Sequence, residues 1–136
     1  MSTIFTKIIE GEIPGRFVYE DEQVVAFLDI NPLTEGHTLV VPRKEVDKWT
    51  DLSPEEWAHL SAVAQKIGNA QKEAFGAPRA GLVIAGFDVP HAHIHVFPAH
   101  AMTDFNFANA GQDGRAEAER LDDAQAKLRA AIQSAS

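Results

Sequence analysis

The sequence predicts an α+β fold: an antiparallel sheet of about five strands with one long helix packed on it, a short N-terminal helix and a C-terminal helix. Three extended runs follow one another within residues 16–41, too closely for parallel pairing, which needs a crossover of a dozen or more residues. A long helical pattern then separates them from two further extended runs. At 136 residues the chain has the length of one domain, so we expect a single domain over residues 1–136.

Turn and breaker residues divide the first half of the chain. Residues 4–9 can form a short helix, and Pro14 and Gly15 mark a turn into the first extended run. Asp21 and Glu22 have the composition of a hairpin connection, and the breaker Asn31-Pro32 ends the second run. The expected strands in this half cover residues 16–20, 23–29 and 37–41.

The second half begins with a strong helix signal. Ser53 and Glu56 form a capping box, with Pro54 at the first helical position. Apolar residues then recur at three- and four-residue steps until Gly76 and Pro78 end the helix. These apolar positions are Trp57, Leu60, Ala64, Ile67 and Ala74. The remaining expected elements are strands over residues 80–86 and 93–97 and a helix over residues 115–132, with Leu121, Leu128 and Ile132 on one side.

The composition excludes several classes of protein. The net charge of −8 argues against a nucleic-acid partner, because binding a phosphate backbone requires clustered Lys and Arg. No apolar stretch approaches the ~20 residues of a membrane span. The absence of cysteine excludes disulfides and thiolate metal ligands, and the N-terminus lacks the pattern of a secretory signal. We therefore expect a cytoplasmic protein without a membrane partner.

Three histidines alternate in one segment that two prolines bracket, Pro90 and Pro98. Side chains of a strand point alternately to opposite faces, so His91, His93 and His95 are expected on one face. The residues between them are small or apolar and can face the core. Burying three imidazoles without a role would leave many polar atoms to satisfy, so the alternation favours a functional site over a structural one.

The chemistry of imidazole suits such a site to phosphoryl or nucleotidyl transfer. With an unperturbed pKa of about 6.5, a histidine at pH 7 is mostly neutral and can act as a nucleophile without a separate base. Rings two residues away along a strand lie roughly 6–7 Å off, close enough to contact the oxygens of a phosphorus under attack. Positioning and charge stabilisation supply most of the catalysis in such reactions.

Several segments resemble the histidine triad (HIT) superfamily, and within it the Hint-like branch. In the motif His91-Ala92-His93-Ile94-His95-Val96-Phe97, histidine alternates with hydrophobic residues and two hydrophobic residues follow. The resemblance covers about residues 3–105, and the helical segment at about 113–134 lies outside it. The other matching segments are Ile4-Phe5-Thr6-Lys7-Ile8-Ile9, Glu12-Ile13-Pro14, Tyr19-Glu20-Asp21, Ala26-Phe27-Leu28-Asp29-Ile30 and His37-Thr38-Leu39-Val40-Val41-Pro42.

The resemblance implies a role for each histidine. His93 would be the nucleophile that forms a nucleotidyl-histidine intermediate, which water then hydrolyses. The backbone carbonyl of His91 would hold the ring N–H of His93, His95 would contact the phosphate, and His37 would support the triad. Asp29 would bind the ribose hydroxyls, which suits an acceptor-only carboxylate. The implied pocket for the base consists of Phe5, Ile8, Phe27 and Ile30.

The same resemblance implies an activity and an assembly. The expected enzyme cleaves a purine nucleoside monophosphate, AMP-like, from a phosphoramidate or phosphoanhydride partner, with no cofactor and no metal. A homodimer would form through the long helix and the strand expected at residues 80–86.

Two departures from the family pattern bear on the substrate. Many members have a Cys-x-x-Cys pair near the N-terminus that helps to bind zinc, where this chain has Thr3 and Thr6. A structural zinc is therefore not expected. The segment before the triad, residues 85–90, is short and lacks the amide and hydroxyl donors of the pattern. It carries Asp88, which would repel a phosphate unless the carboxyl points away or is protonated.

Two other functions fit the same residues. Alternate strand histidines can present nitrogens to Zn²⁺, and Asp88 or His37 could complete such a site. The missing donors also leave open a nucleotide-binding module with little turnover. Without the family match, the four apolar pocket residues would be read as core and Asp29 as a turn residue.

Overall fold

The computed structural model describes residues 2–135, and the predicted α+β class is confirmed. The predicted single domain extends to residues 1 and 136, which lie outside the described residues. Five strands form one antiparallel sheet in the order β1-β2-β3-β5-β4. The strands are β1 (Phe17–Glu20), β2 (Val24–Leu28), β3 (Thr38–Pro42), β4 (Arg79–Val83) and β5 (Ile94–Ala99). The α-helices are α1 (Ile4–Ile9), α2 (Pro54–Phe75) and α3 (Ala118–Ser134).

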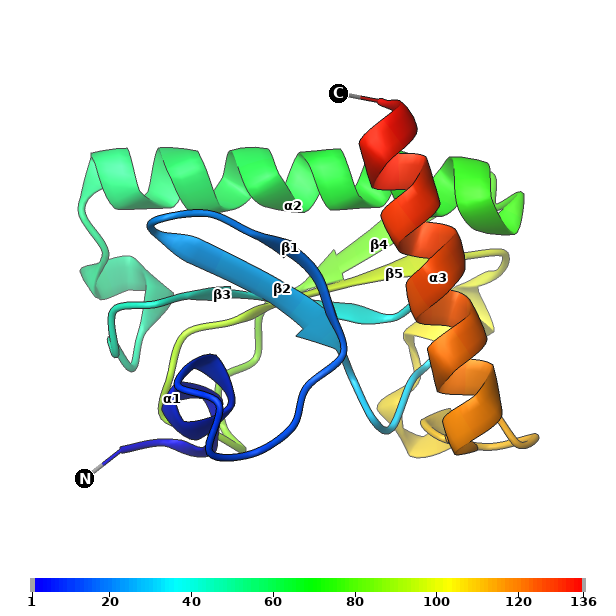
Figure 1. The fold of residues 1–136 in the computed structure, drawn as a ribbon, viewed down its shortest axis with the longest axis horizontal. Helices are drawn as coiled ribbons and strands as arrows, with labels where there is room; N and C mark the ends of the chain where they lie inside the picture. The colour runs from blue at the N-terminus through cyan, green and yellow to red at the C-terminus, as the bar shows by residue number, and fades with distance from the viewer. Residues whose placement is uncertain (1, 136) are drawn as a thin grey trace.

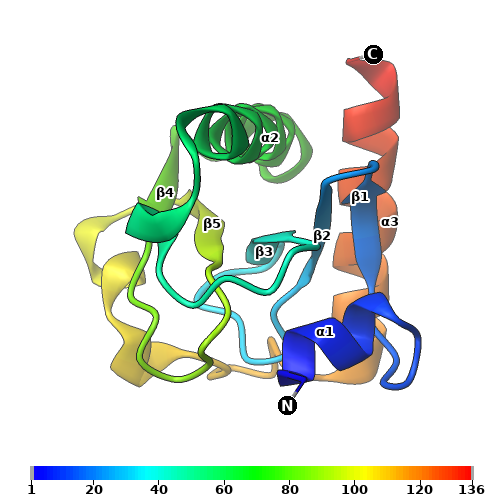
Figure 2. The same cartoon turned by 90° about the vertical axis from the view of Figure 1, so that its left-hand side faces the viewer.

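Helices cover both faces of the sheet. The long helix α2 lies across one face, while α1 lies on the other and α3 packs beside α2 and β1 (Figures 1 and 2). All five residues of β2 are therefore buried. Val24, Ala26 and Leu28 belong to the core under α2 and α3, and Val25 and Phe27 to the core under α1. No helix among the described residues is long and apolar enough to cross a membrane.

The predicted capping box starts α2. The Ser53 hydroxyl accepts a hydrogen bond from the backbone N–H of Glu56 at 3.0 Å, and the Glu56 carboxylate accepts one from the N–H of Ser53 at 2.8 Å. The helix ends at Gly76, which adopts the left-handed conformation with φ 61°. Its apolar face, as predicted, packs on the sheet.

One buried polar residue of α2 ties together the two segments that carry His37 and His95. The Gln71 amide donates to the carbonyl of Gly36 at 2.9 Å and to that of Val96 at 2.8 Å. Each carbonyl belongs to a residue adjacent in sequence to one of the two histidines. Gly36 itself has φ 93°, and an added Cβ would lie 2.4 Å from the Phe75 ring, so the turn before His37 requires glycine.

Several predicted element boundaries were wrong, and the strand predicted over residues 37–41 lies one residue later, at Thr38–Pro42. The last helix begins at Ala118, not at residue 115, because Arg115 donates to the carbonyls of Pro32 and Asn109 in a turn. The strand predicted over residues 80–86 already ends at Val83. The strand predicted from His93 begins at Ile94 and continues through Pro98 to Ala99, where β5 pairs only with β4.

Candidate active site

The four predicted histidines gather at the face of the sheet that α1 covers. His95 lies in β5, His93 immediately precedes that strand, and His37 immediately precedes β3. His91 lies in the preceding loop and contacts the start of α1. As predicted, the rings of His91, His93 and His95 lie on one side of the sheet, although only His95 belongs to a strand. The buried Ile94 and Val96 point into the opposite core, as expected.

His91 is completely buried and held at both ring nitrogens. Its Nε2 lies 2.8 Å from the carbonyl oxygen of Pro42, which can only accept, so Nε2 carries a proton. Its Nδ1 lies 2.8 Å from the hydroxyl oxygen of Thr3, which can donate to it. The backbone is also fixed, since the N–H of His91 donates to the carbonyl of Val89 at 2.8 Å and that of Ala92 donates to the carbonyl of Val46 at 2.6 Å.

A hydrogen-bond network behind His91 involves residues for which the sequence predicts no role. The Glu45 carboxylate accepts from the Thr3 N–H at 2.9 Å and from the Thr6 hydroxyl at 2.7 Å, and these bonds lower its pKa. The N–H of Thr6 donates to the Thr3 hydroxyl at 3.1 Å, which makes Thr3 the N-cap of α1. The two threonines that stand in place of a zinc-binding cysteine pair thus anchor His91 through hydroxyl groups. A Thr-x-x-Thr at a helix start was the sequence signal.

The ring of His93 has its tautomer set by the backbone. Its Nδ1 lies 2.7 Å from the carbonyl oxygen of His91, so Nδ1 carries the proton and Nε2 keeps a lone pair. No described residue hydrogen-bonds to that Nε2. Burial lowers the pKa of His93, although the bond to His91 acts in the other direction. His93 is therefore neutral at pH 7, and the edge-on Phe5 ring at 4.8 Å fixes its plane.

His37 and His95 form a second chain of hydrogen bonds. The backbone N–H of Leu33 donates to Nδ1 of His37 at 2.9 Å, so the ring proton of His37 lies on Nε2. This Nε2 lies 3.0 Å from Nδ1 of His95 and donates to it, which leaves the N–H of His95 on its Nε2. Burial, together with a smaller effect of the neighbouring imidazole, lowers the pKa of His37 to about 3 and that of His95 to about 4. Both rings are neutral at pH 7.

Asp29 lies beside this histidine pair. One carboxylate oxygen is 3.7 Å from Nε2 of His37 and 3.9 Å from Nδ1 of His95, and the other accepts from the Asn31 N–H at 2.9 Å. Burial raises the pKa of Asp29 to about 6, against the bond from Asn31, which lowers it. The group is therefore mostly ionised at pH 7 and titrates just below it.

The geometry suggests a candidate metal centre at Asp29, His37 and His95. The hydrogen bond from Leu33 to His37 disfavours it. The three distances between their ligand atoms, 3.0, 3.7 and 3.9 Å, place a point about 2.1 Å from all three, the usual zinc–ligand distance. A metal would require a lone pair on Nε2 of His37. Because Nδ1 accepts from Leu33, that lone pair is available only if the ring loses its proton or the backbone bond breaks. The donor set does not fit a resident metal.

The predicted base-pocket residues also come together. A pocket of about 180 Å³ opens between α1 and β2, with Ile8, Phe27, Asp29 and Ile30 in its wall. Phe5 lies outside that wall and connects it to the triad, because its ring packs edge-on against Phe27 at 5.6 Å and against His93 at 4.8 Å. Ile30 is 73% exposed at the mouth, so it can cover a ligand but is not part of the core.

Comparison with known proteins identifies one family. Residues 10–102 match the family model described as "HIT domain". The chain is 41% identical over 102 residues to an uncharacterized HIT-like protein of Methanocaldococcus jannaschii, covering 71% of this chain and 78% of that protein. It is 34% identical to an Arabidopsis thaliana protein named adenylylsulfatase HINT3, covering 70% of this chain and 51% of that protein.

Solved structures show the same fold. A Zn-bound histidine triad family protein from Mycobacterium smegmatis superposes with a TM-score of 0.85 at 32% identity, covering 99% of this chain and 96% of the other. A hypothetical histidine triad nucleotide-binding protein from Sulfolobus tokodaii superposes with a TM-score of 0.79 at 29% identity, covering 96% and 92%.

The hydrogen bonds predict one tautomer for each ring. In ¹⁵N NMR spectra of histidine-labelled protein at pH 7, His93 should be protonated at Nδ1, whereas His37 and His95 should be protonated at Nε2. Lowering the pH to 5 should leave His37 and His95 neutral, since their pKa values lie at about 3 and about 4. A His93 ring protonated at Nε2 would contradict the assignment.

Proposed function

The chain belongs to the histidine triad (HIT) family, and on that premise we propose that it is a nucleotide hydrolase whose His93 attacks the α-phosphorus of a nucleotide. The observation that carries the proposal is the 2.7 Å bond between Nδ1 of His93 and the His91 carbonyl, because it leaves a lone pair on Nε2 of a neutral ring. The names of two relatives, an adenylylsulfatase and a nucleotide-binding protein, support a nucleotide as the substrate.

In the first step, Nε2 of His93 forms a bond to the phosphorus and the bond to the leaving group breaks. The lone pair of the ring becomes the new P–N bond, and the ring turns cationic because Nδ1 keeps its proton. The carbonyl of His91 stabilises that cation through the same hydrogen bond. The leaving group departs with its bonding pair, and the nucleotidyl group stays on His93.

The Nε2–H of His95 stabilises the negative charge on the phosphoryl oxygens. The rings of His93 and His95 lie 5.0 Å apart, so one phosphate can contact both. The chain of bonds from Leu33 through His37 keeps the proton of His95 on Nε2. In the second step, water attacks the phosphorus, the P–N bond breaks, and neutral His93 and the nucleoside monophosphate are released.

The nucleoside would lie in the pocket beside α1. Ile8, Phe27 and Ile30 supply apolar surface for a flat base, and a purine makes the larger contact with it. Asp29, at the wall of the same pocket, accepts hydrogen bonds from the ribose diol. Asp29 lies 3.9 Å from His95, so a ribose bound to it would be next to a phosphate bound to His95, as in AMP. Phosphoramidates and phosphoanhydrides of AMP are therefore the proposed substrates.

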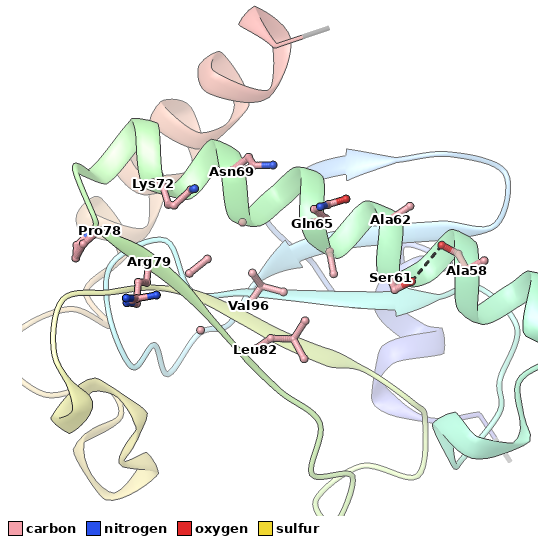
Figure 3. Close-up of a pocket in the computed structure, with 14 residues that line it drawn as sticks. Ala58, Ser61, Ala62, Gln65, Asn69, Lys72, Pro78, Arg79, Leu82 and Val96 are labelled. Carbon is pink, nitrogen blue, oxygen red and sulfur yellow. Dashed lines mark hydrogen bonds between the residues drawn. The ribbon is translucent and has the colours of Figure 1, made fainter.

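We also propose that the active form is a homodimer. The sheet ends at β4, an edge strand on which Leu82 is 53% exposed, and unprotected apolar edges favour pairing with another strand. A groove of about 750 Å³ runs between β4 and α2, with Ser61 and Gln65 on the helix side and Arg79 and Leu82 on the strand side (Figure 3). A second copy related by a two-fold axis would fill the groove and continue the sheet.

Replacing His93 tests the covalent step. With adenosine 5′-phosphoramidate, wild-type protein quenched in acid should carry an added nucleotidyl mass, and His93→Ala should carry none. Turnover by the variant should fall at least about a thousandfold, as when other enzymes lose their nucleophile. His59→Ala, which removes a half-buried histidine of α2 that pairs with Asp21 outside the candidate site, is the matched control. Tight nucleotide binding with neither adduct nor turnover in the wild type would identify a binding module instead.

The pKa of Asp29 predicts a pH-dependent affinity for the nucleoside. Adenosine is the suitable probe because it has no phosphate that titrates in the same range. The carboxylate is present above its pKa of about 6 and is lost below it, so the dissociation constant should rise about tenfold from pH 7 to pH 5. Calorimetry of Asp29→Asn should show weaker binding at pH 7 that no longer changes with pH. An unchanged wild-type affinity at pH 5 would exclude Asp29 from the ribose contact.

A charge at the sheet edge should separate the dimer. We expect wild-type protein to sediment as a dimer and Leu82→Lys to sediment as a monomer, because each copy would bury a lysine against its symmetry mate. Glu73→Lys, on the exposed surface of α2 outside the groove, should remain dimeric. A monomeric wild type at micromolar concentration would refute the assembly.

A further inference from the structure

The segment between β5 and α3 holds the loop that carries His37. This segment, residues 100–117, lies almost entirely beyond the residues that match the family model, which end at residue 102. The N–H of Gly111 donates to the carbonyl oxygen of Pro32 at 2.8 Å, and the guanidinium of Arg115 donates to the same oxygen at 3.4 Å. Both groups therefore act on one peptide bond, the bond between Pro32 and Leu33.

That peptide bond also sets the tautomer of His37. Its carbonyl belongs to Pro32 and its N–H to Leu33, and this N–H donates to Nδ1 of His37 at 2.9 Å. Because a trans peptide unit is planar, its C=O and its N–H point in opposite directions. Groups that hold the oxygen on one side therefore fix the direction of the N–H on the other side.

Every donor in the resulting chain of hydrogen bonds points the same way. The cation of Arg115 lies at one end, and the Nε2–H of His95 lies at the other. The intermediate links are the Pro32–Leu33 peptide and the ring of His37. Hydrogen bonds in such a chain polarise one another, the more so where the dielectric is low. A positive charge at the start of the chain therefore makes the last N–H a stronger donor to an anion.

The guanidinium of Arg115 is partly shielded from water. Its side chain is 16% exposed, and its Nη2 donates to the carbonyl of Asn109 at 2.5 Å, which holds the planar group against Pro32. The carboxylate of Asp113 lies 3.5 Å from the guanidinium but is 87% exposed. Solvent therefore screens the charge of Asp113 more than it screens the charge of Arg115.

The turn that brings these donors to Pro32 has an unusual backbone. Gly111 has φ 74°, and an added Cβ would lie 2.0 Å from the side-chain oxygen of Asn31, so the close approach of its N–H requires glycine. Asp113 has φ 59°, which is uncommon for a residue other than glycine. Residues in such conformations persist where the surrounding structure holds them, and they concentrate at functional sites.

We propose that Arg115 is a positioning residue for the phosphate. Acting through the Pro32–Leu33 peptide, it keeps His37 and His95 in the tautomers that direct an N–H at the phosphoryl oxygens, and it strengthens that N–H as a donor. The inference rests on the proposed function, which supplies the identity of the anion. Arg115 lies outside the wall of the nucleoside pocket, so its effect falls on the phosphate and not on the nucleoside.

Replacing Arg115 by methionine removes the cation and keeps an unbranched apolar side chain. In ¹H–¹⁵N NMR spectra at pH 7 without nucleotide, the Leu33 amide proton and the Nε2 proton of His37 should both move upfield, because every hydrogen bond in the chain weakens. The variant should bind AMP about tenfold more weakly and turn over adenosine 5′-phosphoramidate with a kcat about tenfold lower, a smaller loss than removal of a direct oxyanion donor causes. Its affinity for adenosine should not change.

Arg120→Met is the matched control. Arg120 ties the C-terminal part of the chain to the same loop, but it bonds to Glu35 and to the carbonyl of Asp113 instead of the Pro32 carbonyl. This variant should keep the wild-type proton shifts, AMP affinity and kcat, even where its melting temperature falls. Arg115→Lys, which keeps the charge without the planar fork, should give values between those of wild type and Arg115→Met, and it provides the comparison where the methionine variant does not fold.

The outcomes separate this inference from the proposed function. Equal losses in the Arg115 and Arg120 variants, or wild-type proton shifts and AMP affinity in Arg115→Met, would overturn the inference while leaving the nucleotide hydrolase intact. Upfield shifts and weaker AMP binding in Arg115→Met, with no adduct on wild-type His93, would support the role of Arg115 and overturn the hydrolase.

Discussion

The hydrogen bond between the ring of His93 and the carbonyl of His91 is the constraint on which the candidate site depends. A neutral imidazole has one donor and one acceptor nitrogen, so fixing the donor on a backbone carbonyl decides which nitrogen can attack. This carbonyl fixes the tautomer of His93 only if its own position is fixed. His91 is therefore buried completely, bonded to Pro42 and Thr3, and followed by a backbone bond to Val46. Glu45 and Thr6 extend that support to the protein surface.

A backbone group also sets the tautomers of His37 and His95, but here it donates a hydrogen bond instead of accepting one. A backbone N–H at Leu33 occupies Nδ1 of His37, which pushes the ring proton to Nε2 and from there sets the tautomer of His95. Burial keeps both rings neutral, so they can supply a directed N–H without adding a full positive charge to the resting site. For Asp29 burial raises the pKa, because the neutral form of a carboxyl is the protonated one. One low-dielectric environment thus holds the histidines neutral and brings a carboxyl close to its titration point.

The fold supplies this environment by covering the sheet on both faces. Gln71 of α2 joins the carbonyls next to His37 and His95 from one side, and Phe5 of α1 packs against His91 and His93 from the other. The nucleophile lies between two pockets of different chemistry, one apolar with a single carboxylate and one with aromatic and charged residues in its wall. The departures of this chain from the family pattern, two threonines and a shortened loop, both lie in contact with the triad segment.

Local sequence determined the elements whose signals are local: the capping box at Ser53, the left-handed stop at Gly76, the closely spaced strands and the alternation of His91, His93 and His95. The family resemblance named nine residues for the site, and in the structure they lie around His93 and the pocket beside α1. Sequence did not show that Arg115 belongs to a turn, because the carbonyl of Pro32 that holds it is distant in the chain. Nor did it show the network from Glu45 to His91 or the second pocket at Trp49 and Phe87. Ring tautomers, shifted pKa values and the shapes of pockets arise from groups that meet only after folding, so the tertiary structure alone decided them.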